Sequence, residues 1–103
     1  MKYAINAPLA PEAIGPYSQG TTAGRLAFAS GQLPISPDDP QRLVEGGIVE
    51  QTERVIDVIE AILGEVGCTL ADVAQTTVYL RSLDDLDALN EVYARRFVSP
   101  APA

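Results

Sequence analysis

Residues 48–67 read IVEQTERVIDVIEAILGEVG, and this stretch decides the fold. Its apolar residues recur at intervals of three and four, the spacing of one face of an α-helix. Gly46-Gly47 precede the run and Gly67 follows it, as a left-handed helix end requires. The pattern predicts a helix from Ile48 to Val66. The expected apolar face is Ile48, Thr52, Val55, Ile56, Ile59, Ile62, Leu63 and Val66.

A second helix is predicted from Leu83 to Phe97, with Leu86, Leu89, Tyr93 and Phe97 on one stripe. Ser82, followed three residues later by Asp85, resembles a capping box with Asp in place of Glu. Acidic residues lie in its first turn and Arg95-Arg96 in its last, which suits the helix dipole.

The remaining elements are short strands. The segments 17–22 and 26–33 flank a turn and predict a hairpin, and Lys2 to Asn6 is an expected edge strand. Val73 to Arg81 is rich in β-formers and predicts a further strand, with one face suited to a partner subunit. The proline-rich segment from Pro34 to Gly47 predicts a loop. Strands that alternate with two helices predict an α/β (α+β) fold in which the helices cover a sheet.

Composition narrows the possible functions. The chain has 103 residues, room for one domain, and a formal charge of −7 that disfavours nucleic acid as a partner. Zero histidines and one cysteine predict no metal site and no internal disulfide. We expect no membrane span and no signal peptide, hence a cytoplasmic protein.

Two motifs resemble those of a known protein family. Residues 13–20 read AIGPYSQG and residues 29–34 read ASGQLP; matching segments follow at 51–52, 64–68, 72–80, 83–86 and 90–93. Together, in this order and spacing, they resemble the reactive intermediate deaminase A (RidA) family, also grouped as L-PSP endoribonucleases and translation inhibitors. The resemblance covers nearly the whole chain. It implies a chorismate-mutase-like subunit that forms a homotrimer with ligand clefts between subunits.

The resemblance also implies an activity. RidA proteins hydrolyse reactive enamines and imines, such as 2-aminoacrylate, 2-iminopropanoate and 2-iminobutanoate, to 2-keto acids and ammonia without a cofactor. By position in the motifs, the expected substrate-binding residues are Tyr17, Ser30, Gly31, Gln32, Leu86 and Asn90. Each has a structural alternative: a core tyrosine, a β-bulge at 30–31, a solvated Gln32, a core-stripe Leu86 and a surface Asn90.

The family pattern continues after the second helix with a carboxylate-binding arginine, a cysteine and a glutamate that positions water. This sequence ends at Pro102-Ala103, so its catalytic residues stay unassigned. We interpret residues 1–103 as a single domain truncated at its C-terminal end, because loss of two strands would expose the helices' apolar faces. A non-catalytic ligand-binding or regulatory trimer is the alternative function; a ribonuclease is disfavoured by the charge and the lack of histidine.

Overall fold

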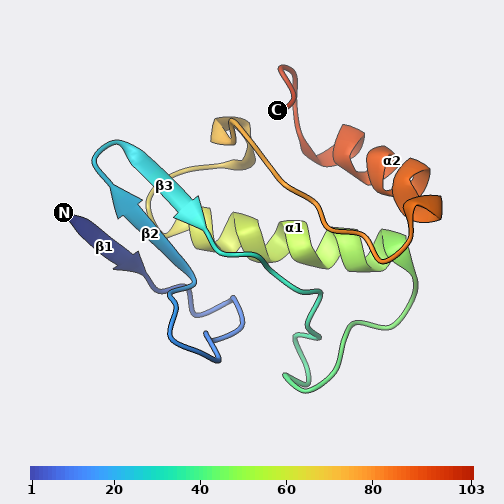
Figure 1. Ribbon diagram of the computed structural model, residues 1–103, viewed down its shortest axis with the longest axis horizontal. Coiled ribbons are helices and arrows are strands. Elements are labelled where there is room, and N and C mark those ends of the chain that lie inside the picture. The colour runs from blue at the N-terminus through green and yellow to red at the C-terminus, as the bar shows by residue number, and fades with distance from the viewer.

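The computed structural model describes residues 1–103 and is a mixed α/β arrangement of short strands and two helices (Figure 1). In chain order the elements are β1 (Lys2–Ile5), β2 (Gly20–Ala23), β3 (Leu26–Ala29), α1 (Ile48–Gly64), the 3₁₀ turns η1 (Leu70–Asp72) and η2 (Leu83–Asp85), and α2 (Leu86–Arg96). The α/β class predicted from the sequence is confirmed. Neither helix combines the length and the apolar character that crossing a bilayer requires.

The sheet consists of β1, β2 and β3, all antiparallel, with β2 in the middle. The turn between β2 and β3 is Gly24-Arg25, in which only Gly24 has a positive φ, of 60°. A glycine at the first position of a two-residue loop is typical of the turns that join twisted strands. The predicted hairpin and edge strand are therefore confirmed. The strands are shorter than predicted, because the pairing of named strands stops at Gly20 and Ala29.

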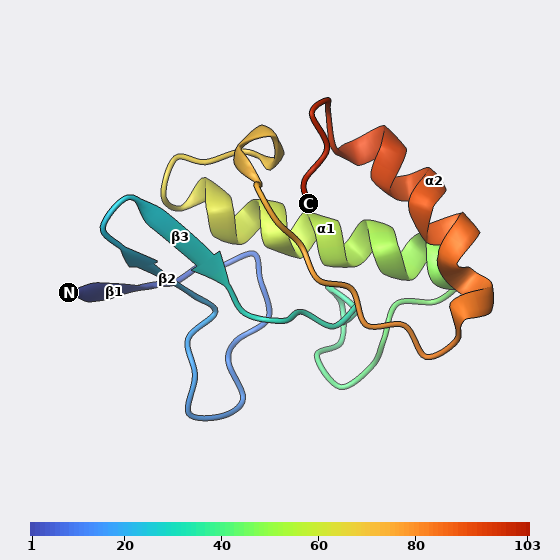
Figure 2. The same cartoon turned by 45° about the horizontal axis from the view of Figure 1, so that its top comes forward.

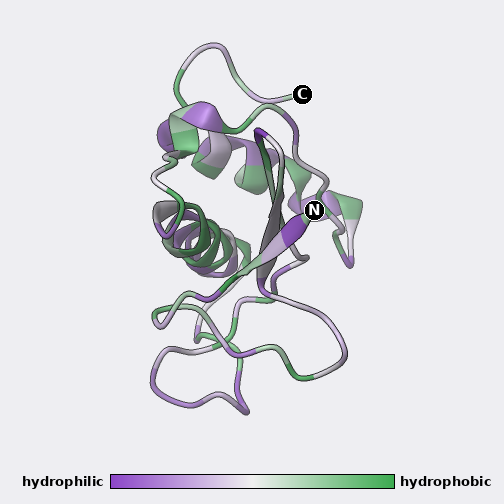
Figure 3. Cartoon of the chain, turned by 90° about the vertical axis from the view of Figure 1, so that its left-hand side faces the viewer, coloured by the Kyte–Doolittle hydropathy of each residue, from purple (hydrophilic) through white to green (hydrophobic).

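Helix α1 lies beside the sheet (Figure 3). It supplies residues to both buried apolar clusters. Toward the strands and the loop after β1, Val58 and Ile62 pack with Ile5, Ala7 and Ala10. Toward α2, Ile56 packs with Leu70, Val92 and Phe97. Burial of one such aliphatic side chain stabilises a fold by about 1.5–3 kcal/mol. The helix is thus buried on two sides, which explains why Val58 is fully buried although it lies outside the predicted stripe.

Glycines flank α1 at its start and after its end, as predicted. At the start, the Gly47 N–H donates to the Glu50 carboxylate at 3.0 Å, which satisfies one of the free amides of the first turn. At the end, Gly67 has a φ of 75° and the Cys68 N–H donates to the Leu63 carbonyl at 3.0 Å. The left-handed glycine predicted at position 67 is confirmed. The helix proper ends at Gly64, two residues before the predicted end.

The predicted strand from Val73 to Arg81 is wrong. The segment crosses α1 as an extended chain, yet it pairs with no strand (Figure 1). Its backbone partner is Ala103: the Thr76 N–H donates to the Ala103 carbonyl, and the Ala103 N–H donates to the Ala74 carbonyl. β-Forming residues favour an extended backbone, but a strand also requires a neighbour along its length.

The second predicted helix is confirmed with a different start. Residues 83–85 form a 3₁₀ turn, and the α-helical part runs from Leu86 to Arg96. The Ser82 hydroxyl accepts a hydrogen bond from the Asp84 N–H at 3.2 Å, so Ser82 is a cap. The Asp85 side chain does not return a bond to the Ser82 N–H, so no capping box forms; instead the Asp85 N–H donates to the Ser82 carbonyl at 3.2 Å, as the tighter 3₁₀ turn requires.

Gly20 is the tightest glycine in the sheet. A Cβ there would lie 2.6 Å from the Phe28 carbonyl oxygen and 3.0 Å from Ile62 Cγ2. We predict that Gly20→Ala lowers the free energy of unfolding by about 1–3 kcal/mol, the usual cost of overpacking. Urea denaturation measures it. Gly64→Ala, where nothing lies within 4 Å of the added Cβ, is the control and should leave the midpoint unchanged or raise it.

Candidate functional site

The hairpin brings four of the predicted site residues to one end of the sheet. Pairing of β2 with β3 continues one step beyond the named strands, where the Ser30 N–H donates to the Gln19 carbonyl at 2.9 Å. The Ser30 hydroxyl donates to the Ser18 carbonyl, and Gln32 Nε2 donates to the Ser30 carbonyl at 3.2 Å. Tyr17 therefore lies close along the chain to residues that bond Ser30. We name Tyr17, Ser30, Gly31 and Gln32 the hairpin group.

Gly31 and Gln32 present free backbone donors in this group. The N–H groups of both residues donate to no acceptor in the chain. Gly31 is exposed, and no atom would lie within 4 Å of a Cβ at that position. An outside acceptor such as a carboxylate can therefore approach the backbone here, which a larger residue would hinder. The bulge suggested as the alternative for Ser30-Gly31 is absent, since Ser30 keeps the register of the hairpin.

Tyr17 is half exposed, with 49% of its surface accessible, so it is not a core tyrosine. Its ring folds back near Gly15, where an added Cβ would lie 3.4 Å from Tyr17 Cδ2. The hydroxyl accepts a hydrogen bond from the Ile14 N–H at 3.3 Å and still has its own proton to donate. The ring can form an apolar wall and the hydroxyl can contact a polar ligand atom.

Leu86 and Asn90 lie on α2 and form a separate pair. They are four residues apart and so share one helix face. Leu86 is 43% exposed, which leaves it out of the buried clusters and contradicts its alternative as a core residue. Asn90 is exposed and its side-chain amide has no partner in the chain. We name these two residues the helix pair.

The hairpin group and the helix pair lie apart within one chain. Helix α2 packs against α1 and η2, whereas the hairpin lies toward the other end of α1 (Figure 2). The six predicted residues thus form two surfaces of one molecule and not one continuous cleft. Their assignment as substrate-binding residues stays a prediction.

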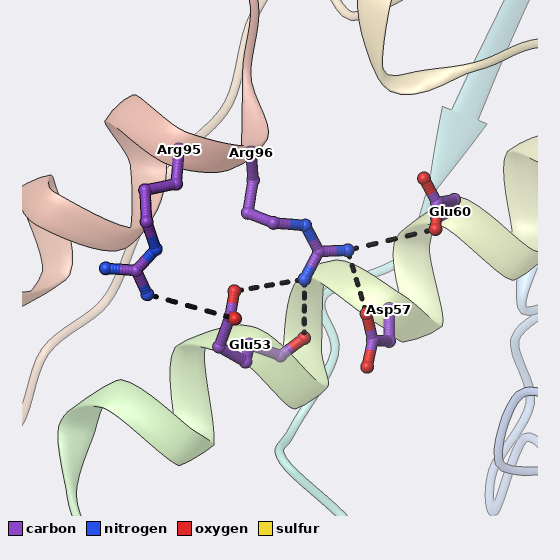
Figure 4. A network of polar contacts seen from close by, with 5 residues as sticks. All are labelled: Glu53, Asp57, Glu60, Arg95 and Arg96. Carbon is purple, nitrogen blue, oxygen red and sulfur yellow. Dashed lines mark hydrogen bonds and ion pairs between the residues drawn. The ribbon is translucent and has the colours of Figure 1, made fainter.

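An ion-pair network fixes α2, and with it the helix pair, on α1 (Figure 4). Arg96 Nη1 donates to Glu53 at 3.0 Å and Nη2 to Asp57 at 2.8 Å; Glu60 lies 3.8 Å from Nη2. Burial lowers the pKa of Arg96, but the hydrogen bonds to Asp57 and Glu53 and the attraction of their charges outweigh it, so the net shift is upward. Arg96 is charged at every ordinary pH and clamps the two helices. The sequence suggested only a dipole role for it.

Comparison with known proteins identifies the family. The family model described as Endoribonuclease L-PSP matches residues 7–103. The chain belongs to this family, the RidA family.

Relatives of the RidA family align along nearly all of the chain. A RutC family protein from Pyrococcus abyssi is 49% identical over 91% of this chain and 73% of its own length. A 2-iminobutanoate/2-iminopropanoate deaminase from goat (Capra hircus) is 41% identical over 96% of this chain and 72% of its own. The crystal structure of RidA from the Antarctic bacterium Psychrobacter is 38% identical, with a TM-score of 0.90 over 98% of this chain and 80% of that one. The RidA fold expected from the motifs is confirmed.

Gln19 was not singled out by the sequence analysis, although it lies within the motif that resembles RidA. It is 8% exposed, and its carboxamide hydrogen-bonds four backbone groups. The motif includes Gln19, but the sequence gives no indication that this residue is buried. Its hydrogen-bond partners lie 8–12 residues away along the chain.

The network in Figure 4 gives a matched pair of variants. We predict that Arg96→Met lowers the free energy of unfolding by about 1–2 kcal/mol, because it removes two charge-assisted hydrogen bonds between α1 and α2. Arg95→Met removes one exposed contact of 3.8 Å and should cost less than about 0.5 kcal/mol. Chemical denaturation of both variants measures the difference, and equal losses would contradict a specific role for Arg96.

Proposed function

We propose that the protein hydrolyses small 2-imino acids, and the enamines in equilibrium with them, to 2-keto acids and ammonia. The observation that carries the proposal is the pair of free backbone amides at Gly31 and Gln32, at the end of a hairpin whose other strand follows the half-exposed Tyr17 along the chain. The goat relative, 41% identical over 96% of this chain, is named for this reaction.

The reaction needs few groups from the protein. An enamine such as 2-aminoacrylate first gains a proton at carbon and loses one from nitrogen, which converts it to 2-iminopropanoate. Water then adds to the C=N carbon, and the resulting aminol loses ammonia as the C–N bond breaks and the C=O bond forms. No electrons leave or enter, so no redox partner is required. Residues 1–103 contain no histidine, so within them proton transfers fall to water, tyrosine or carboxylates.

The hairpin group supplies binding and orientation in this proposal. The amides of Gly31 and Gln32 donate to the substrate carboxylate, and donors held by the backbone bind an anion without reorganisation. The Tyr17 ring covers the alkyl part of the substrate. Ser30, whose hydroxyl and amide both bond the chain across the hairpin, holds Gly31 in place.

We further propose that the chain acts as a homotrimer, in which the helix pair of one subunit faces the hairpin group of the next. The separation of the two groups within one chain favours a site shared between copies. Large apolar side chains are also exposed on the segment after η1 and on β3: Tyr79 is 92% accessible and Phe28 is 54% accessible. Burial of such residues against a second copy would give the association its driving force.

The activity is tested on protein purified from its natural source, after its intact mass has been measured. We predict release of ammonia and 2-oxobutanoate from freshly generated 2-iminobutanoate, faster than in buffer alone. Tyr17→Ala should lower kcat/KM about tenfold or more, because the substrate loses a wall of its site. Tyr3→Ala, which removes an exposed tyrosine from β1, is the matched control and should leave kcat/KM unchanged.

Two other results would decide against the deaminase. Saturable binding of 2-oxobutanoate with no release of ammonia from the imine would favour the ligand-binding alternative. RNA cleavage that copurifies with the protein and disappears in Tyr17→Ala would favour a ribonuclease, against the charge of −7.

The trimer is tested by native mass. Light scattering should give a mass about three times the measured intact mass of one chain. Tyr79→Lys should shift the mass toward one chain, because a buried lysine without a partner opposes association. Gln41→Lys adds the same charge at an exposed loop position and should leave the mass unchanged. A native protein with the mass of a single chain would refute the shared site.

A further inference from the structure

The Gln19 side chain is buried, and both its carbonyl oxygen and its amide nitrogen hydrogen-bond the loop that carries Tyr17. Its Oε1 accepts from the Ala7 N–H at 2.6 Å. Its Nε2 donates toward the carbonyls of Pro11 at 2.8 Å, Ala7 at 3.2 Å and Ala10 at 3.3 Å. A carboxamide offers one acceptor and two N–H donors, so no other polar side chain of this length satisfies both kinds of partner.

These bonds are the polar attachment of the loop to the rest of the molecule. The other hydrogen bonds of the loop join residues within 7–17, as in the bond from the Ala10 N–H to the Ala7 carbonyl. Ala7 and Ala10 pack in the first apolar cluster, but residues 12–17 are all exposed. The position of Tyr17 therefore depends on the Gln19 carboxamide, which holds the loop up to Pro11, and on the backbone from residue 17 to 19.

The backbone of the same residue binds the other half of the hairpin group. The Gln19 carbonyl accepts from the Ser30 N–H at 2.9 Å, and the preceding carbonyl, of Ser18, accepts from the Ser30 hydroxyl. Ser30 directly precedes the free amides of Gly31 and Gln32. One residue thus connects the loop that presents the Tyr17 ring with the strand end that presents the donors.

We propose that Gln19 is a positioning residue that sets the distance between the Tyr17 ring and the amides of Gly31 and Gln32, and so determines the affinity for a small carboxylic acid. This role, which rests on the proposed function of the hairpin group, is exerted through Tyr17. Gln19 itself is enclosed and touches no ligand. Loss of the Gln19 hydrogen bonds releases the loop, so substrate binding weakens while the rate of the chemical step changes little.

Two variants test this role in the native protein. Gln19→Met keeps the side-chain length and removes all four bonds. Gln19→Glu keeps the acceptor but points a carboxylate at three carbonyl oxygens. We expect both to raise KM for the imine about tenfold with kcat within about twofold, because binding common to ground and transition states is lost. The Tyr17 ring resonances, assigned with Tyr17→Phe, should shift in both.

A control of matched stability separates positioning from folding. Val92→Ala opens a cavity in the cluster beside α2, away from the loop, and is compared at a temperature at which both proteins remain folded. It should leave KM and the Tyr17 resonances unchanged. A similar rise in KM in Val92→Ala, or an unchanged KM in Gln19→Met, would overturn the role of Gln19.

Failure of the proposed function is distinguishable from failure of this inference. If the wild-type protein releases no ammonia from imines, the deaminase proposal falls, and Gln19 is then tested by titration of 2-oxobutanoate against the Gly31 and Gln32 amide resonances. A tenfold weaker dissociation constant in Gln19→Met supports the positioning role. An equal constant in the two proteins, or no shift of these resonances in the wild type, refutes it.

Discussion

Every layer of the structure depends on the packing of α1, because this helix supplies residues to both apolar clusters. Val58 and Ile62 hold the loop after β1 and the sheet, and Ile56 holds α2. Neither the three short strands nor the 11-residue α2 has a second buried surface of comparable size. Short helices and isolated hairpins are marginal in water, so their stability comes from α1. The sheet that carries the hairpin group and the helix that carries the helix pair are therefore both held by α1.

The sequence predicted the elements whose signals are local. Periodicity placed both helices, and Gly24 and Gly67 marked a turn and a helix end that the structure confirms. The errors occur where the outcome depends on a distant neighbour. Val58 was missed because a helix packed on two sides buries more than one stripe, and residues 73–81 lack the adjacent strand that their composition favours.

In the candidate site too, local features were predictable and contacts between distant residues were not. The contact of Ser18 and Gln19 with Ser30 follows from the hairpin register, which the turn residues made predictable. The separation of Leu86 and Asn90 from this group could not be read from motifs, which give order along the chain and no distances. The burial of Gln19 was equally hidden, because a glutamine is usually exposed and its partners here are backbone groups of a loop without regular structure.

The charge distribution gives the hairpin group its suitability for an anion despite a net charge of −7. Residues 13–33 contain Arg25 as their one charged residue, so all fourteen carboxylates lie outside the segment that forms this group. Three of these carboxylates, on Glu53, Asp57 and Glu60 of α1, form ion pairs with Arg96 of α2. Physiological salt screens exposed charges beyond about 8 Å, so a small anion responds mainly to its immediate surroundings. At the hairpin, the Gly31 and Gln32 N–H groups are free to donate to the carboxylate of a ligand. Residues 13–33 contribute no negative charge that would repel it.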